Sequence, residues 1–206
     1  MSGITGRKVS TVLTDYDGER KSNLILDVTN SECECAWDSA LKPIGEFWNR
    51  EAFDLWWDRC QAQVGHLHPM IAEQWVHRPW GESPYRHLPI EQLRWCLEEW
   101  DTSKILEKVY VRRHSGEFHP DSDLQYIQNT DSQKFKSLQA HLKATGTWDY
   151  PIVVIETPEG VLDYETPLPE FRFCLIEGHK RLRYLKAFAS QSLTANRHDV
   201  FVLTLS

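Results

Sequence analysis

The stretch FRFCLIEGHKRLRYLKAF, residues 171–188, decides how the chain is interpreted. It begins with an apolar run that ends at Ile176, and a glycine follows at position 178. Beyond it, apolar residues recur at the spacing of one helical face: Leu182, Leu185, Phe188 and Ala189. The pattern predicts a strand, a turn and a helix in that order, which is typical of a mixed α/β fold.

Positive charge is concentrated at the start of the predicted helix, at Lys180, Arg181 and Arg183. Basic side chains there oppose the helix dipole, so their position alone is unfavourable. A bound phosphate reverses this, because first-turn N–H groups lack helical partners and arginine donates bidentate hydrogen bonds to phosphate. Gly178 permits positive φ and the close approach of a ligand. The alternative is that these are solvated charges, one of them paired with Glu177.

The surrounding sequence supplies further predicted elements. We expect buried strands at 151–157 and 198–205 and a helix over 135–146 that stops at Gly146. A short strand at 88–90, a helix over 93–100 and a second helix over 102–109, capped by Asp101 or Thr102, precede them. Residues 114–132 and 156–170 are polar or rich in proline and predict loops.

Residues 85–206 resemble the ParB/sulfiredoxin-like superfamily in the order and spacing of five segments: RHLPIEQL, FKSLQAHLKATG, PIVVI, CLIEGHKRLRYLKA and VFVLTL. The resemblance implies an α/β (α+β) domain with a small mixed sheet and flanking helices. It covers more than half of the chain. Residues 1–84 remain as an N-terminal, tryptophan-rich and mainly helical region, which we expect to pack on this core.

The resemblance also implies a role for the turn. ParB proteins hold nucleotide phosphates with a G-E-R-R turn, sulfiredoxin uses ATP with G-C-H-R, and related free-serine kinases carry an acid-G-H-x-R turn. Gly178 and Arg181 match the glycine and the last arginine of all three. By this likeness, Arg181 is expected to bind a phosphate of ATP or CTP next to Gly178. Together with the charge pattern, this predicts a nucleotide-binding site formed by Gly178, His179, Lys180, Arg181 and Arg183.

The sequence Glu177-Gly178-His179 is most similar to the kinase version of the turn. This likeness implies catalytic roles for Glu177 and His179. Glu177 could act as a general base on an acceptor hydroxyl or hold Mg²⁺, and the alternative is a surface ion pair. His179 stands where sulfiredoxin has its cysteine, so sulfinic-acid reduction is not expected, and we expect Cys174 in the core.

These observations predict a nucleotide-binding protein, either an NTP-dependent phosphotransferase or an NTPase. The alternative is a non-catalytic module that binds a nucleotide or a protein partner. A nuclease ranks last, because no carboxylate cluster suited to two metal ions is present. No direct metal ligand is predicted: His66 and His68 lack a further ligand at suitable spacing.

The length and the net charge of the chain limit the number of domains and the classes of partner to expect. The 206 residues suit one medium domain with an extension, and the net charge of −7 makes direct DNA binding an unfavoured interpretation. No helix-turn-helix is expected after the domain. No segment approaches the ~20 apolar residues that span a bilayer. The first ten residues lack the apolar centre of a signal peptide, so we expect a cytoplasmic protein without membrane contact.

The N-terminal region predicts a strand at 24–28, a helix over 46–64 that ends at Gly65, and loops over 64–85. The apolar face of that helix is predicted to contain Trp48, Ala52, Leu55, Trp56 and Cys60. Six tryptophans precede Tyr85: Trp37, Trp48, Trp56, Trp57, Trp75 and Trp80. We expect Trp48, Trp56 and Trp75 in the core and leave Trp57 and Trp80 open, because aromatic residues also anchor protein partners.

Overall fold

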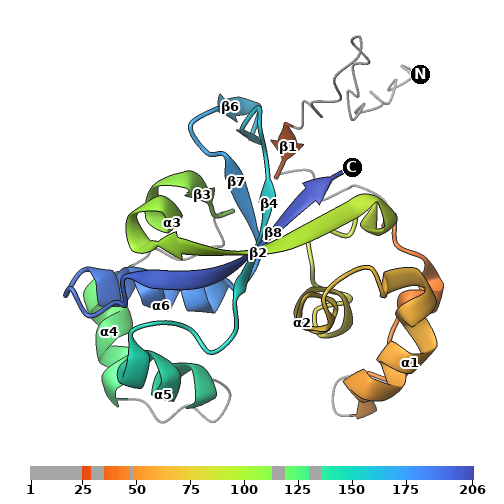
Figure 1. Ribbon diagram of the computed structural model, residues 1–206, viewed down its shortest axis with the longest axis horizontal. Helices are drawn as coiled ribbons and strands as arrows, with labels where there is room; N and C mark the ends of the chain where they lie inside the picture. Colours follow the sequence, from red (N-terminus) through yellow and green to blue (C-terminus); the bar gives the residue numbers. More distant parts are fainter. Residues whose placement is uncertain (1–24, 29–34, 47–48, 113–118, 130–135) are drawn as a thin grey trace, which may run out of the picture.

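The computed structural model describes residues 25–28, 35–46, 49–112, 119–129 and 136–206. A five-stranded mixed sheet has the order β2-β8-β4-β7-β3, and a three-stranded sheet has the order β1-β5-β6 (Figure 1). The larger sheet contains β2 (Leu93–Asp101), β3 (Val109–Tyr110), β4 (Ile152–Glu156), β7 (Phe173–Glu177) and β8 (Arg197–Leu205). The smaller contains β1 (Leu26–Asp27), β5 (Val161–Asp163) and β6 (Thr166–Leu168).

Helices lie on both sides of the larger sheet (Figure 1). One side holds α1 (Phe53–Val64), α2 (Pro69–Ile71) and the π-helical turn Ala72–His77 that continues α2. The other side holds α3 (Thr102–Lys108), α4 (Pro120–Asn129), α5 (Lys136–Thr145) and α6 (His179–Ala189). Short 3-10 turns occur at Ser39–Leu41 and Ile90–Gln92. Within the described residues the molecule is therefore a mixed α+β fold.

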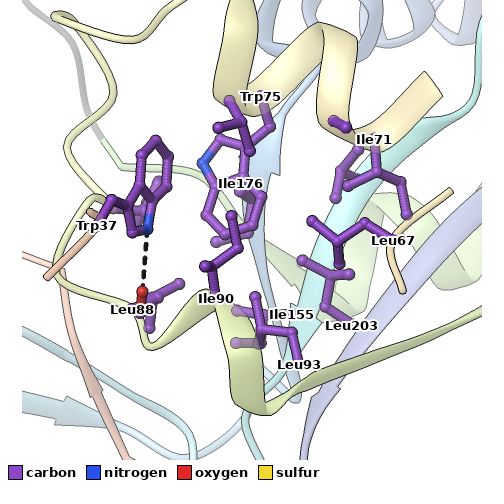
Figure 2. Packing of buried hydrophobic residues seen from close by; sticks show 14 of the residues in the cluster. Trp37, Leu67, Ile71, Trp75, Leu88, Ile90, Leu93, Ile155, Ile176 and Leu203 are labelled. Carbon is purple, nitrogen blue, oxygen red and sulfur yellow. Dashed lines mark hydrogen bonds between the residues drawn. The ribbon is translucent and has the colours of Figure 1, made fainter. Parts of the chain in front are cut away.

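The alternation of side chains along the central strands produces two apolar layers. Val153 and Ile155 belong to the cluster that contains the N-terminal residues, whereas Ile152 and Val154 belong to the cluster under α6. Figure 2 shows Trp75 and Ile176 in the first cluster. The other residues labelled in this layer come from the N-terminal region, from the segment just before β2 and from the strands of the larger sheet: Trp37, Leu67, Ile71, Leu88, Ile90, Leu93, Ile155 and Leu203.

The strand and the helix predicted from residues 171–188 are confirmed as β7 and α6. The strands predicted at 151–157 and 198–205 are β4 and β8, and α5 ends at Gly146 as expected. Asp101 caps α3, since its carboxylate accepts a 2.7 Å hydrogen bond from the Lys104 N–H. Phe135, included in the predicted helix, lies outside the described residues.

The helix predicted over 93–100 is wrong: the segment is strand β2. It pairs antiparallel with β8 along its whole length, from Leu93 opposite Leu205 to Asp101 opposite Arg197. Leu97, which fitted a helical face, is 52% exposed. The pairing partner lies about a hundred residues later in the chain, so local apolar spacing could not reveal it. The strand predicted at 88–90 is also absent, and a 3-10 turn begins at Ile90 instead.

Three predicted loops contain regular structure. Residues 64–85 include α2 and the π-helical turn, where His68 caps α2 by accepting from the Met70 N–H at 3.1 Å. Residues 114–132 include α4, held by buried Ile127. Residues 156–170 form the β5–β6 hairpin. In each case tertiary burial or strand pairing overrides a polar, proline-rich local composition.

The tryptophans of the N-terminal region are used mainly for packing. Those that are buried are Trp37, Trp56, Trp75 and Trp80, while Trp57 is partly buried and Trp48 lies outside the described residues. The indole N–H of Trp37 donates to the Leu88 carbonyl at 3.0 Å (Figure 2). The predicted apolar face of α1 is correct for Trp56 and Cys60 but not for Leu55, which is 61% exposed.

Among the described helices, none combines the length and apolar character needed to traverse a lipid bilayer.

Candidate functional site

Gly178 forms the turn between β7 and α6. Its backbone is left-handed, with φ +107° and ψ 23°, and it occupies the N-cap position of α6. A Cβ added there would lie 2.6 Å from Cγ2 of Ile152. Glycine is therefore required both by the backbone conformation and by the close approach of β4. The first-turn N–H groups of α6 that follow have no helical partners, which makes this helix end suited to an anion.

A pocket of about 890 Å³ lies at this turn, where the carboxyl end of β7 meets both helical layers. Its lining comes from the turn, from the segment before β4, from α5 and from the N-terminal region. The residues are Arg50, Gln74, Arg78, Pro79, Glu82, Ser137, Leu138, Asp149, Tyr150, Glu177, Gly178, His179, Lys180 and Arg181. The size is within the range of small-molecule sites in proteins.

Arg181 is held in place at the pocket by an ion pair. Its Nε donates to Oδ1 of Asp149 at 3.3 Å, and both side chains are mostly buried, with 14% and 12% exposed. The guanidinium carbon also lies 5.5 Å from the ring centroid of Tyr150. Because Nε binds Asp149, the two terminal nitrogens are the part of the guanidinium that can bind a ligand.

The other predicted phosphate ligands divide into two groups. His179 and Lys180 line the pocket, as the first two residues of α6. Arg183 is not among the lining residues: its Nε donates to Oδ2 of Asp123 at 2.6 Å, which joins α6 to α4. The structure therefore brings four of the five residues together and gives Arg183 an ion pair elsewhere.

Glu177 ends β7 and lines the pocket beside Gly178. Burial raises the pKa of its carboxyl above the ordinary value, against the lowering effects of the Gly178 N–H, Arg181 and Arg78. A raised pKa brings a carboxylate closer to the basicity that suits proton abstraction at neutral pH. The arrangement thus provides a candidate base next to an anion-binding helix end.

Replacing Glu177 with glutamine is expected to change how stability depends on pH. A folded pKa above the unfolded value means that the folded state binds more protons between the two values, so stability falls as pH rises through that window. The free energy of unfolding of Glu177→Gln, relative to that of the wild type, should therefore increase as the pH rises above about 4.5, the ordinary pKa of the carboxyl group. Urea unfolding at pH 4, 5.5 and 7 measures this, and an equal difference at all three would contradict it.

Sequence reasoning missed the second wall of the pocket, which contains Arg50, Gln74, Arg78 and Glu82. Arg50 hydrogen-bonds to the backbone carbonyls of His77 and Arg78, at the end of the π-helical turn. These residues lie in segments that the sequence predicted as a helix and loops. Arg50 and Arg78 are separated by 28 positions, so no local spacing indicated that they meet.

Cys174 is fully buried on β7, as predicted, and its Sγ lies 3.4 Å from the Tyr85 hydroxyl. Burial raises the pKa of this thiol to about 12, so its reactive thiolate is suppressed.

We expect iodoacetamide to label Cys35 and Cys96, which are exposed, while Cys60 and Cys174 stay protected in the folded protein. Site-resolved mass spectrometry before and after denaturation checks this, and labelling of native Cys174 at the rate of Cys35 would contradict it.

Within the described part of the chain, no group of three or more His, Cys, Asp or Glu side chains is placed to hold a metal ion. A search of protein-family models, curated proteins and solved structures yields no match to this chain.

Proposed function

We propose that this protein binds a nucleotide, ATP or CTP, with its phosphates at the N-terminus of α6, and uses it as a phosphoryl donor or hydrolyses it. The proposal includes a ParB/sulfiredoxin-like assignment for residues 85–206. The observation that carries it is the collection of Gly178, Lys180, Arg181 and Glu177 around one pocket.

Electrostatics support a phosphate ligand. The chain has a net charge of −7, yet the pocket lining contains more cations than carboxylates. The cations are Arg50, Arg78, Lys180 and Arg181, and the carboxylates are Glu82, Asp149 and Glu177. Clustered cations in a cleft attract anions and raise their local concentration. The N–H groups of the first turn of α6 add further donors to the same place.

The chemistry assigned to the chain is positioning and proton transfer. The hydroxyl oxygen of an acceptor, or water, attacks the terminal phosphorus, the bond to the nucleoside diphosphate breaks, and Glu177 takes the hydroxyl proton. Arg181 and Lys180 balance the charge on the phosphoryl oxygens, which is the main contribution that proteins make to such transfers. His179, at the first position of α6, adds its backbone N–H to the phosphate site.

Magnesium fits this pocket only as a companion of the phosphates. Mg²⁺ takes one or two protein carboxylates and completes its shell with phosphate oxygens and water. Glu82 and Glu177 line the pocket, and Glu82 would hold the ion while Glu177 serves as the base. The ion would supply neutralisation of phosphate charge.

Thermal unfolding with ATP, CTP, GTP or UTP, with and without Mg²⁺, tests the proposal. A ligand at 100 times its dissociation constant should stabilise the fold by ~2.7 kcal/mol. Release or transfer of phosphate that disappears in Glu177→Gln, with binding retained, would establish the enzyme. Stabilisation without turnover would indicate a non-catalytic module, and no shift with any nucleotide would refute the proposal.

A further inference from the structure

The side chain of Gln74 is buried at the pocket, and no described residue hydrogen-bonds to its amide. It is 4% exposed and lines the pocket, and neither Nε2 nor Oε1 has a partner among the described residues. Leaving a buried amide unpaired costs free energy, so such groups are rare in native proteins and call for a specific explanation. The position of Gln74 at the pocket points to a partner that belongs to a ligand.

The segment that carries Gln74 is itself unusual. It is the π-helical turn Ala72–His77, and π-helical turns are rare and occur frequently at functional sites. The neighbouring Trp75 fixes the turn, because its ring is buried in the core (Figure 2). Its Nε1 also donates to the Ser83 hydroxyl at 3.1 Å. His77 adds a 2.8 Å hydrogen bond to the Glu51 carbonyl. These contacts hold the segment that carries Gln74 against the core of the protein.

The chemistry of the amide limits what part of a ligand lies there. Oε1 is an acceptor, and an ionised phosphate has no proton to donate to it. Gln74 consequently requires a ligand group that presents a donor beside an acceptor. The edge of a nucleobase has this pair, and glutamine binds adenine in this bidentate way in protein–DNA complexes.

We propose that Gln74 binds the base of the nucleotide whose phosphates lie at Gly178, so that the N-terminal region supplies recognition of the base and α6 supplies recognition of the phosphates. This inference rests on the proposed function. The pocket contains both groups of residues, since Gln74 and Arg78 line it together with Gly178 and Arg181. The sequence resemblance, limited to residues 85–206, covers nine of the 14 lining residues and none of the five in the N-terminal region.

The test compares nucleotides with inorganic tripolyphosphate, which has phosphates but no base. Isothermal titration of the full chain should show one nucleotide binding at least tenfold more tightly than tripolyphosphate. Gln74→Leu, which replaces the amide with a slightly shorter apolar side chain, should reduce this ratio by about tenfold and leave the affinity for tripolyphosphate within twofold.

Gln139→Leu is the matched control. Gln139 is equally buried, at 4% exposed, and no described residue hydrogen-bonds to its Nε2, but it does not line the pocket. Its replacement should leave the ratio of nucleotide to tripolyphosphate affinity unchanged.

Stability without ligand gives an independent readout. Because Gln74→Leu removes an unpaired buried amide, the Tm of the ligand-free protein is expected to rise by about 2–4 °C. A fall of the same size would mean that Gln74 is bonded within the free protein, and would overturn the inference.

The binding outcomes separate the two proposals. If nucleotides bind and Gln74→Leu leaves the ratio intact, or if tripolyphosphate binds as tightly as every nucleotide, the inference on Gln74 is overturned while phosphate binding stands. If neither nucleotides nor tripolyphosphate bind, the proposed function fails as well.

Discussion

Replacing Arg181 with alanine is expected to weaken binding of ATP or CTP by about 10- to 100-fold. Hydrogen bonds from a charged donor contribute about 1.5–3 kcal/mol, and every 1.4 kcal/mol is a tenfold change in affinity. The guanidinium is already oriented by Asp149, so little conformational freedom is lost when a phosphate binds. Isothermal titration with the preferred nucleotide measures the effect, after urea unfolding has shown that the variant is folded.

Arg183→Ala is the comparison on the same helix. It removes the 2.6 Å ion pair with Asp123, whose side chain is only 9% exposed, and leaves that carboxylate unpaired. We expect lower stability with the dissociation constant within twofold of the wild type. If Arg183→Ala weakens nucleotide binding as much as Arg181→Ala does, the division of roles between these arginines is incorrect.

Gly178→Ala is expected to lower the free energy of unfolding by about 2–5 kcal/mol. A left-handed backbone costs a residue with a Cβ roughly 1–2 kcal/mol, and overpacking a core adds about 1–3 kcal/mol. Here the added Cβ would lie 2.6 Å from Ile152 Cγ2, a buried atom of β4. Urea unfolding measures the loss.

Gly81→Ala serves as the control, because a Cβ at Gly81 meets nothing within 4 Å. Its effect should remain within about 0.5 kcal/mol. Combining Gly178→Ala with Ile152→Ala should cost less than the sum of the single changes, since the second removes the obstructing methyl group. Strict additivity would show that the clash with Ile152 does not contribute.

The sequence predicted the part of the fold in which local patterns and tertiary structure agree. The run from Phe173 through Gly178 to α6 has a strand, a glycine with positive φ and an apolar helical face in direct succession. Segments whose local pattern disagrees with the structure that their distant partners impose were predicted incorrectly. Strand β2 depends on pairing with β8, and α4 depends on burial of Ile127 and Asp123.

The residues of the candidate site also differ in whether the local sequence could predict them. Glu177, Gly178 and Arg181 are contiguous enough to form a motif, so they could be predicted. Gln74 and Arg78 could not, because their proximity to the turn arises from the packing of Trp75 against the sheet next to Ile176. That contact joins parts of the chain separated by about a hundred residues.

The larger sheet is apolar on both faces, and the described residues between 25 and 90 cover one of them. In a shortened protein that began at residue 85, Ile155, Ile176 and Leu203 would be exposed to water as part of one continuous hydrophobic surface. Calorimetry of the full chain should accordingly record a single unfolding transition, because the N-terminal region and the sheet domain bury their apolar residues against each other.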